Sequence, residues 1–194
     1  MTSITYRGKI IHLLPQVYEP AEDSFLLVDA LIDNIKDGDR VIELGCGSGI
    51  VSLFAQNRAS LVVATDLNPY AVRCAGKNGI NAIRTDLFDG INGQFDLIVF
   101  NPPYLPTSDE ERLSGWDGLM LEGGKNGRQT IKRFIDGLGD YLSPKGRVLL
   151  LVSSLTGIKE VCNIMNNAGL FVEPISKSKH FFEQLVVLKG IRNK

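Results

Sequence analysis

The sequence predicts an α/β fold, with one mostly parallel sheet, helices on both faces and an antiparallel hairpin at the C-terminal edge. Short apolar segments alternate with helical patterns from residue 40 to residue 168. The segment 147–152 (RVLLLV) is continuously apolar, as expected of a strand that is covered on both faces. Only a short polar link separates the last two predicted strands, so we expect them to pair antiparallel.

The N-terminal half of this pattern begins with an arm. Residues 1–20 hold apolar pairs closed by Pro15 and Pro20, and we expect them to form an arm on a single domain at 21–194. Apolar residues at helical spacing predict a helix at 22–35, which Lys36-Asp37-Gly38 ends. The elements that follow are a strand at 40–44, a helix at 49–57, a strand at 61–65, a helix at 69–78 and strands at 80–84 and 95–100.

A stretch with little periodicity, residues 105–127, interrupts the alternation. An irregular segment of about 20 residues in a compact domain is uncommon unless it is functional, so we expect a lid over the substrate, with Trp116 as a packing anchor. The regular pattern then resumes, with apolar residues on one stripe of the next helix. Its elements are a helix at 128–139, a strand at 147–152, a helix at 156–168 and strands at 170–175 and 181–188.

The totals exclude several classes of protein. The 194 residues carry 44% hydrophobic and 22% charged side chains and a net charge of −1, which fits one domain with a sizeable core. A protein that neutralises many phosphates carries excess Lys and Arg, so nucleic acid is not expected as a direct substrate. Three cysteines, at 46, 74 and 162, lack metal-ligand spacing and indicate reduced thiols in a cytoplasmic protein without a metal site. No signal peptide or membrane span is predicted.

A glycine-rich segment follows the strand at 40–44 and opens a helix. In Glu43-Leu-Gly-Cys-Gly-Ser-Gly49, the glycines allow a sharp turn and a close approach to a ligand. The segment lacks the Gly-Lys-Ser/Thr ending of a phosphate loop. An acid just before the glycines repels phosphate and attracts an ammonium group, so we expect a ligand that is cationic at this point. The alternative for the glycines alone is an ordinary tight turn.

Acidic residues also end the next two predicted strands. Asp66 lies about 20 residues after the glycines, where an acid accepts the two ribose hydroxyls of a nucleoside. Its alternative role is to cap the following helix, which Asn68 could do instead. Asp86 and Leu87 together suit an adenine, since they offer one hydrogen-bond acceptor and one apolar contact, although Asp86 alone is typical of a turn.

The tetrapeptide Asn101-Pro102-Pro103-Tyr104 ends an apolar strand. A planar NH2 group has two hydrogens, which the Asn101 side-chain oxygen and the Pro102 carbonyl can accept, while Tyr104 can stack on its plane. Fixing both hydrogens directs the nitrogen lone pair at an electrophile without a general base. Ligands bind at the carboxyl ends of the strands in such sheets, so this tetrapeptide and the acids at 43, 66 and 86 are expected to form one site.

A ligand with an adenosine and an ammonium-bearing tail is S-adenosylmethionine, and the order E-x-G-x-G-x-G, D, D-L, N-P-P-Y resembles that of class I methyltransferases. Residues 17–27 (VYEPAEDSFLL) and 122–128 (EGGKNGR) further resemble the eukaryotic and archaeal branch of the HemK-like release-factor glutamine N5-methyltransferases. This resemblance covers nearly the whole chain. It implies a single Rossmann-like domain with a seven-stranded, mostly parallel sheet.

The resemblance implies methylation of the side-chain amide of the glutamine in the Gly-Gly-Gln loop of a translation termination factor. It also implies a small zinc-binding activator, which we expect to form a heterodimer by adding a strand at the short edge strand 80–84. The acceptor site is assigned to Asn101, Pro102, Pro103 and Tyr104. The cofactor contacts are assigned to Ser24, Glu43, Gly45, Cys46, Gly47, Gly49, Asp66, Leu67, Asp86, Leu87 and Asn101. An ordinary first-turn helix position is the alternative for Ser24.

Three other functions remain open from the sequence. An adenine N6-methyltransferase presents the same planar NH2 to the same residues, but it needs a basic channel to deliver a flipped base, and the near-neutral charge argues against one. Protein lysine methylation is a second alternative. A cofactor-binding subunit without catalysis is the third, and the intact Asn-Pro-Pro-Tyr sequence argues against it.

Overall fold

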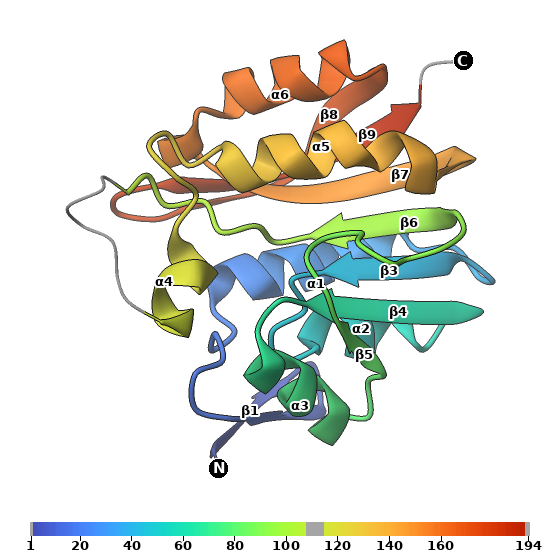
Figure 1. Cartoon of the computed structure of the whole chain (residues 1–194), viewed down its shortest axis with the longest axis vertical. Helices are drawn as coiled ribbons and strands as arrows, with labels where there is room; N and C mark the ends of the chain where they lie inside the picture. Colours follow the sequence, from blue (N-terminus) through green and yellow to red (C-terminus); the bar gives the residue numbers. More distant parts are fainter. Residues whose placement is uncertain (1, 108–114, 193–194) are drawn as a thin grey trace.

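The structure, a computed structural model, describes residues 2–107 and 115–192 (Figure 1). It contains a two-stranded sheet at the N-terminus and a seven-stranded sheet. The elements in chain order are β1 (Thr2–Tyr6), β2 (Lys9–Leu13), α1 (Glu22–Asn34), β3 (Arg40–Leu44), α2 (Ile50–Ala55), β4 (Leu61–Asp66), α3 (Pro69–Lys77), β5 (Ala82–Arg84), β6 (Phe95–Phe100), α4 (Trp116–Leu121), α5 (Gln129–Tyr141), β7 (Leu142–Ser153), the 3-10 helix η1 (Ser154–Thr156), α6 (Ile158–Asn167), β8 (Leu170–Lys179) and β9 (Gln184–Arg192).

The large sheet has the strand order β5-β4-β3-β6-β7-β9-β8. Strands β3 to β7 run parallel, β9 runs antiparallel to β7, and β8 runs antiparallel to β9. The predicted fold class is confirmed, including the C-terminal hairpin and the edge position of β5. The chain builds outward in opposite directions from β3 and from β6, so the carboxyl ends of these two neighbours form the switch point where such sheets bind ligands.

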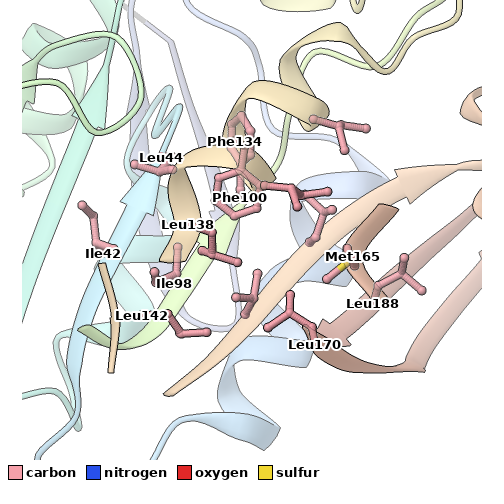
Figure 2. Close-up of a cluster of buried hydrophobic side chains, with 14 of the residues drawn as sticks. Ile42, Leu44, Ile98, Phe100, Phe134, Leu138, Leu142, Met165, Leu170 and Leu188 are labelled. Carbon is pink, nitrogen blue, oxygen red and sulfur yellow. The ribbon is translucent and has the colours of Figure 1, made fainter. Parts of the chain in front are cut away.

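One face of the large sheet packs against α5 and α6. Figure 2 shows the cluster, in which Phe100 of β6 meets Phe134 of α5 with ring centroids 5.0 Å apart. Met165 of α6 and Leu188 of β9 extend the same cluster toward the hairpin. These helices therefore hold the end of β6, from which the Asn-Pro-Pro-Tyr segment departs.

The opposite face packs against α1 and α2, with the strands buried between the two layers. In β7, Leu149 and Leu151 face the α1–α2 layer, whereas Val148, Leu150 and Val152 face the α5–α6 layer. Successive side chains of a strand point to opposite faces, so a strand covered on both sides must be apolar at every position. This explains the continuous apolar run that the sequence shows here.

The N-terminal arm predicted at residues 1–20 contains a paired hairpin, β1–β2, that the sequence did not predict. Ile11 of β2 is fully buried in the α1–α2 layer. Tyr6 of β1 stacks on Phe25 of α1, with ring centroids 4.3 Å apart. The hairpin therefore packs on the first helix, which carries the acidic residues of the YEPAED stretch.

Several further boundaries differ from the sequence prediction, among them the ends of β8 and β9, at Lys179 and Arg192 instead of 175 and 188. Strand β7 begins at Leu142 instead of 147, and β9 begins at Gln184 instead of 181. The segment 105–127, predicted to be an irregular lid, contains the short helix α4. Residues 108–114 of that segment lie outside the described residues, so the lid stays a prediction.

Within the described ranges, no helix is long and apolar enough to cross a membrane. The same residues contain no group of three His, Cys, Asp or Glu side chains that could hold a metal ion. The three cysteines are free thiols.

Candidate active site

The carboxyl ends of β3, β4 and β6 surround a cavity of about 250 Å³. It lies at the switch point of the sheet, between β3 and β6. With one exception, Gly49, the residues predicted to form the site all line this cavity. They are Ser24, Glu43, Gly45, Cys46, Gly47, Asp66, Leu67, Asp86, Leu87, Asn101, Pro102, Pro103 and Tyr104.

Two glycines of the loop after β3 serve different purposes. Gly47 has a φ of 53°, a left-handed conformation that favours glycine, and its N–H donates a 2.9 Å hydrogen bond to Asp66. Gly49 instead faces α3, where an added Cβ would lie 3.1 Å from the Cβ of Ala75. Gly47 therefore shapes the cavity wall, whereas Gly49 allows the turn before α2 to lie close to α3.

Glu43 is a buried carboxyl in β3, at the floor of the glycine loop. Its Oε2 accepts hydrogen bonds from the backbone N–H of Ser52, at 2.8 Å, and from the Ser52 hydroxyl, at 2.5 Å. Burial raises the pKa of Glu43 to about 8, and the charge of Asp66 adds to the rise. The carboxyl is therefore largely protonated at neutral pH, and a cation placed beside it would favour the ionised form.

Asp66 ends β4, and its two oxygens are held by backbone N–H groups. Oδ2 accepts from Gly47 at 2.9 Å, and Oδ1 accepts from Asn68 at 2.8 Å. Each carboxylate oxygen has a second lone pair that can accept a hydroxyl. The side chain of Asn68, not that of Asp66, caps α3 by accepting from the N–H of Tyr70. The cap therefore does not account for Asp66.

Asp86 and Leu87 follow β5 at the cavity wall. Asp86 accepts a 2.8 Å hydrogen bond from Arg133 of α5, an ion pair that the sequence did not predict. Leu87 has a φ of 50°, a conformation that non-glycine residues rarely adopt. Backbone strain of this kind concentrates at ligand sites, where the surrounding structure maintains it.

Asn101 follows β6 directly, and Asp23 of α1 orients its side chain. The amide nitrogen of Asn101 donates a 3.0 Å hydrogen bond to Oδ2 of Asp23, a buried carboxyl. The hydroxyl of Tyr18 donates to the same oxygen at 3.0 Å. Among the described residues, the buried side-chain oxygen of Asn101 has no hydrogen-bond partner. Asn101 lines the cavity, so its unpartnered oxygen is a candidate acceptor for a ligand's N–H.

The segment 122–128 packs against the backbone of Tyr104 and Leu105. The N–H of Leu105 donates to the carbonyl of Leu121, and the N–H of Gly123 donates to the carbonyl of Leu105, both at 2.9 Å. A Cβ on Gly127 would collide with the carbonyl oxygen of Tyr104. Glycine at this position therefore lets the EGGKNGR segment lie directly against the Asn-Pro-Pro-Tyr backbone. Burial raises the pKa of the Tyr104 phenol, which is neutral at physiological pH.

Several residues at the cavity were not recognised from the sequence. Asp23, Tyr18 and Arg133 line it, although none was assigned a role. Trp116, predicted to be a packing anchor, is half-buried at the start of α4 and also lines the cavity. The YEPAED stretch was the available signal for the first two, since it places a phenol just before α1 and a carboxyl in its first turn. The hydroxyl of Ser24 donates to Asp23 at 3.1 Å, so it belongs to the same hydrogen-bond group.

This arrangement combines acidic side chains with one unpaired amide oxygen. The carboxyls of Asp23, Glu43 and Asp66 favour a ligand that carries positive charge and hydroxyl groups. The oxygen of Asn101 favours a second ligand that donates a hydrogen bond. Such a cavity suits the transfer of a group from a charged nucleoside to a nitrogen.

The chain matches known methyltransferases over most of its length. The family model described as the methyltransferase small domain matches residues 20–117. A Methanocaldococcus jannaschii protein that is named as a protein N5-glutamine methyltransferase is 43% identical, with 97% of this chain and 98% of that protein covered. The human methyltransferase HEMK2 is 37% identical over 79% of each chain.

Solved structures give the same result. The E. cuniculi Mtq2–Trm112 complex, described as responsible for methylating the eRF1 termination factor, matches with a TM-score of 0.78 and 32% identity. That match covers 92% of this chain and 99% of the other. A Thermus thermophilus 16S rRNA methyltransferase, solved with AdoMet and guanosine, matches half of its length with a TM-score of 0.73. At 19% identity, this second match shows the shared fold alone.

Proposed function

Because the chain belongs to the methyltransferase small domain family, in its HemK-like protein glutamine methyltransferase branch, we propose that it methylates a translation termination factor. The acceptor is the side-chain amide nitrogen of the glutamine in the factor's Gly-Gly-Gln loop. The methyl donor is S-adenosylmethionine. One observation carries this proposal: the buried oxygen of Asn101 is unpaired, while Asp23 holds its amide nitrogen.

The residues at the cavity fit S-adenosylmethionine. Gly45 and Gly47 line the cavity, and Gly45 has little room for a side chain, since an added Cβ would lie 3.3 Å from the ring of Phe100. Asp66 can accept hydrogen bonds from the ribose hydroxyls. Glu43, in its ionised form, can pair with the ammonium group. Leu87, whose backbone is strained, can offer its side chain as an apolar contact for the adenine. When bound, S-adenosylmethionine supplies a methyl group attached to a sulfonium, which is a strong electrophile.

The acceptor nitrogen is a poor nucleophile because its lone pair is delocalised into the amide. The Asn101 oxygen accepts one N–H of the substrate amide and the Pro102 carbonyl accepts the other, which fixes the nitrogen lone pair in one direction. Tyr104, whose phenol is neutral, stacks on the amide plane. The nitrogen would bond to the methyl carbon as the bond from that carbon to sulfur breaks, with a neutral thioether as the leaving group. The nitrogen would become positively charged between these oxygens and would then lose a proton to water.

Asp23 contributes by orienting Asn101. An asparagine amide that is free to rotate presents either its oxygen or its nitrogen to the cavity. The Asp23 carboxylate accepts only from the nitrogen, so the oxygen is left free to accept from a substrate. Asp23 is therefore a positioning residue for the acceptor amide.

We also propose a small zinc-binding activator subunit that binds the β5 edge. E. cuniculi Mtq2 was solved with its partner Trm112. Strand β5 forms one edge of the sheet, and Ile83 on it is half-exposed, which leaves backbone groups and an apolar side chain for an added strand. On gel filtration of the coexpressed chains, we expect one heterodimer peak with the wild type and separate peaks with Ile83→Asp. Separate elution of the wild-type chains would contradict this.

We place the reaction in the cytoplasm, where termination factors bind ribosomes. The three free cysteines fit a reducing compartment. Fractionation of cells with an antibody against the chain tests this placement, and recovery in a secreted or membrane fraction would contradict it.

The experiment that tests the proposed function is transfer of a labelled methyl group to alternative acceptors. The enzyme, coexpressed with its activator, is incubated with a purified termination factor, the same factor with Gln→Ala in its Gly-Gly-Gln loop, duplex DNA and single-stranded DNA. We expect label only in the unaltered factor. Label in DNA would identify adenine as the methyl acceptor in place of glutamine. Equal label in the Gln→Ala factor would identify another residue of the factor, such as lysine, as the acceptor.

A further inference from the structure

Two phenylalanines project from the turn between β8 and β9. Phe181 is 93% exposed and Phe182 is 86% exposed, more than any other large hydrophobic side chain in the described part of the chain. Their rings contact each other edge to face, with centroids 4.7 Å apart. They belong to none of the buried apolar clusters.

Neither turn chemistry nor core packing accounts for these residues. The N–H of His180 donates a 2.8 Å hydrogen bond to the carbonyl of Glu183, which closes a turn with the two phenylalanines at its central positions. Turn positions are dominated by small and polar residues, namely glycine, proline, asparagine, aspartate and serine. Phenylalanine gains no conformational advantage there and leaves two apolar rings in water. Exposed aromatic residues that do not stabilise the fold are typical of a contact with another molecule.

This turn, residues 180–183, is held beside the candidate active site. The carboxylate of Glu183 accepts a 2.5 Å hydrogen bond from the Ser153 hydroxyl at the carboxyl end of β7. The N–H of Gln184 donates to Ser154 at 3.0 Å. Leu185, at the start of β9, belongs to the same apolar layer as Tyr104. Figure 1 shows the turn on the side of the sheet where β6 ends.

We propose that Phe181 and Phe182 are a docking contact for the folded protein substrate, outside the cavity that binds the acceptor glutamine. This inference rests on the proposed function. Through these two rings the enzyme binds a whole folded factor more tightly than a short peptide that contains the same glutamine. Lys177 and Lys179 are exposed on the strand that leads to the turn. The matching surface of the substrate is therefore apolar with carboxylates around it.

The test compares whole-protein and peptide substrates. The double variant F181S/F182S removes both rings, and methyl transfer is measured with the folded termination factor and with a short peptide that contains the Gly-Gly-Gln sequence. We expect KM for the factor to rise about tenfold or more, with kcat unchanged. The peptide should react equally with both enzymes, because it is too short to reach the turn. Phe171→Ser is the matched control, since Phe171 is 59% exposed at the opposite end of β8.

The outcomes separate this inference from the proposed function. If the wild type methylates the factor and the double variant has the same KM, the docking contact is wrong and the proposed function stands. If the wild type methylates neither factor nor peptide, both proposals fall. Two further measurements on the wild type and the double variant cover other occupants: co-sedimentation with vesicles of phosphatidylcholine and phosphatidylserine, and analytical ultracentrifugation. Loss of vesicle binding or of self-association in the variant, with KM for the factor unchanged, would assign the rings to a membrane or to a second copy.

Discussion

The amide nitrogen of Asn101 donates a 3.0 Å hydrogen bond to Oδ2 of Asp23, which lies 78 positions earlier in the chain. Asp23 is buried in the first turn of α1, and Asn101 follows β6, so the fold brings a helix start and a strand end together. The buried oxygen of Asn101 has no hydrogen-bond partner among the described residues. The proposed aiming of the substrate amide depends on this contact.

We predict that Asp23→Asn slows methyl transfer without preventing folding. An asparagine at this position can donate as well as accept, so the Asn101 amide can rotate and present its nitrogen to the substrate. Misplacement of a positioned group costs up to about a hundredfold in rate. Single-turnover methylation of the factor measures the loss. Asp33→Asn, a change at an exposed position of the same helix, is the control, and equal rates for the two variants would contradict the assigned role.

We predict that S-adenosylhomocysteine binds more tightly as the pH rises from 6 to 8. The pKa of Glu43 is about 8, so below that pH the carboxyl must lose a proton to pair with the ligand's ammonium group. Affinity should strengthen by up to about tenfold per pH unit. Calorimetry at pH 7 in two buffers of different ionisation enthalpy should detect proton release. The dependence should vanish in Glu43→Gln, whereas a flat profile for the wild type would contradict the placement of the ammonium group.

The same carboxyl predicts how the stability of the cofactor-free protein changes with pH. The folded chain keeps the Glu43 proton up to about pH 8, whereas the unfolded chain releases it near the ordinary value of 4.5. Between these values the folded state binds more protons, so the free energy of unfolding falls as the pH rises. Urea unfolding of wild type and Glu43→Gln at about pH 5 and pH 8 should show a relative gain for the variant of about 2–4 kcal/mol at the higher pH. Parallel profiles would contradict the burial of an ionisable group here.

We predict that Gly127→Ala lowers kcat through Tyr104. The added Cβ collides with the Tyr104 carbonyl, so the Asn-Pro-Pro-Tyr backbone must shift. The φ of 70° at Gly127 adds strain for any other residue. Methylation rate and thermal melting are measured beside Gly139→Ala, a change in α5 where a Cβ meets nothing within 4 Å. The control should gain up to about 1 kcal/mol in stability and keep its rate. An unaffected kcat in Gly127→Ala would show that the segment 122–128 does not set the position of Tyr104.

The sequence predicted the elements whose signals are local. Apolar alternation located β3, β4 and β6, and glycines marked the turn after β3. The N-terminal hairpin was missed because its turn is Arg7-Gly8, with φ values of 45° and 79°. Hairpin turns with two such residues are usually recognised by Asn-Gly or Asp-Gly, and arginine at the first position conceals the signal. The early start of β7 was missed because Pro144 and Gly146 are typical of a turn.

The part of the candidate site that could not be predicted depends on contacts between distant residues. Asp23 has the sequence appearance of an ordinary acid in a helix's first turn, where it complements the helix dipole. Only the packing of α1 beside β6 makes it a partner of Asn101. Arg133 likewise lies on an outward position of α5 and reaches Asp86 only because the sheet places β5 and α5 near the same cavity. No periodicity or motif encodes either contact.

The most direct test of the account is the identification of the methylated atom after a single turnover with wild type and Asn101→Ala. Tandem mass spectrometry of the digested factor locates the added methyl group, and calorimetry with S-adenosylhomocysteine checks that cofactor binding is intact in both. We predict one methyl group on the glutamine side chain with the wild type and at least a hundredfold slower transfer with the variant at equal cofactor affinity, as for loss of a group that stabilises developing charge. A methyl group on another residue, or an unchanged rate with Asn101→Ala, would contradict the central claim that Asn101 aims the glutamine nitrogen.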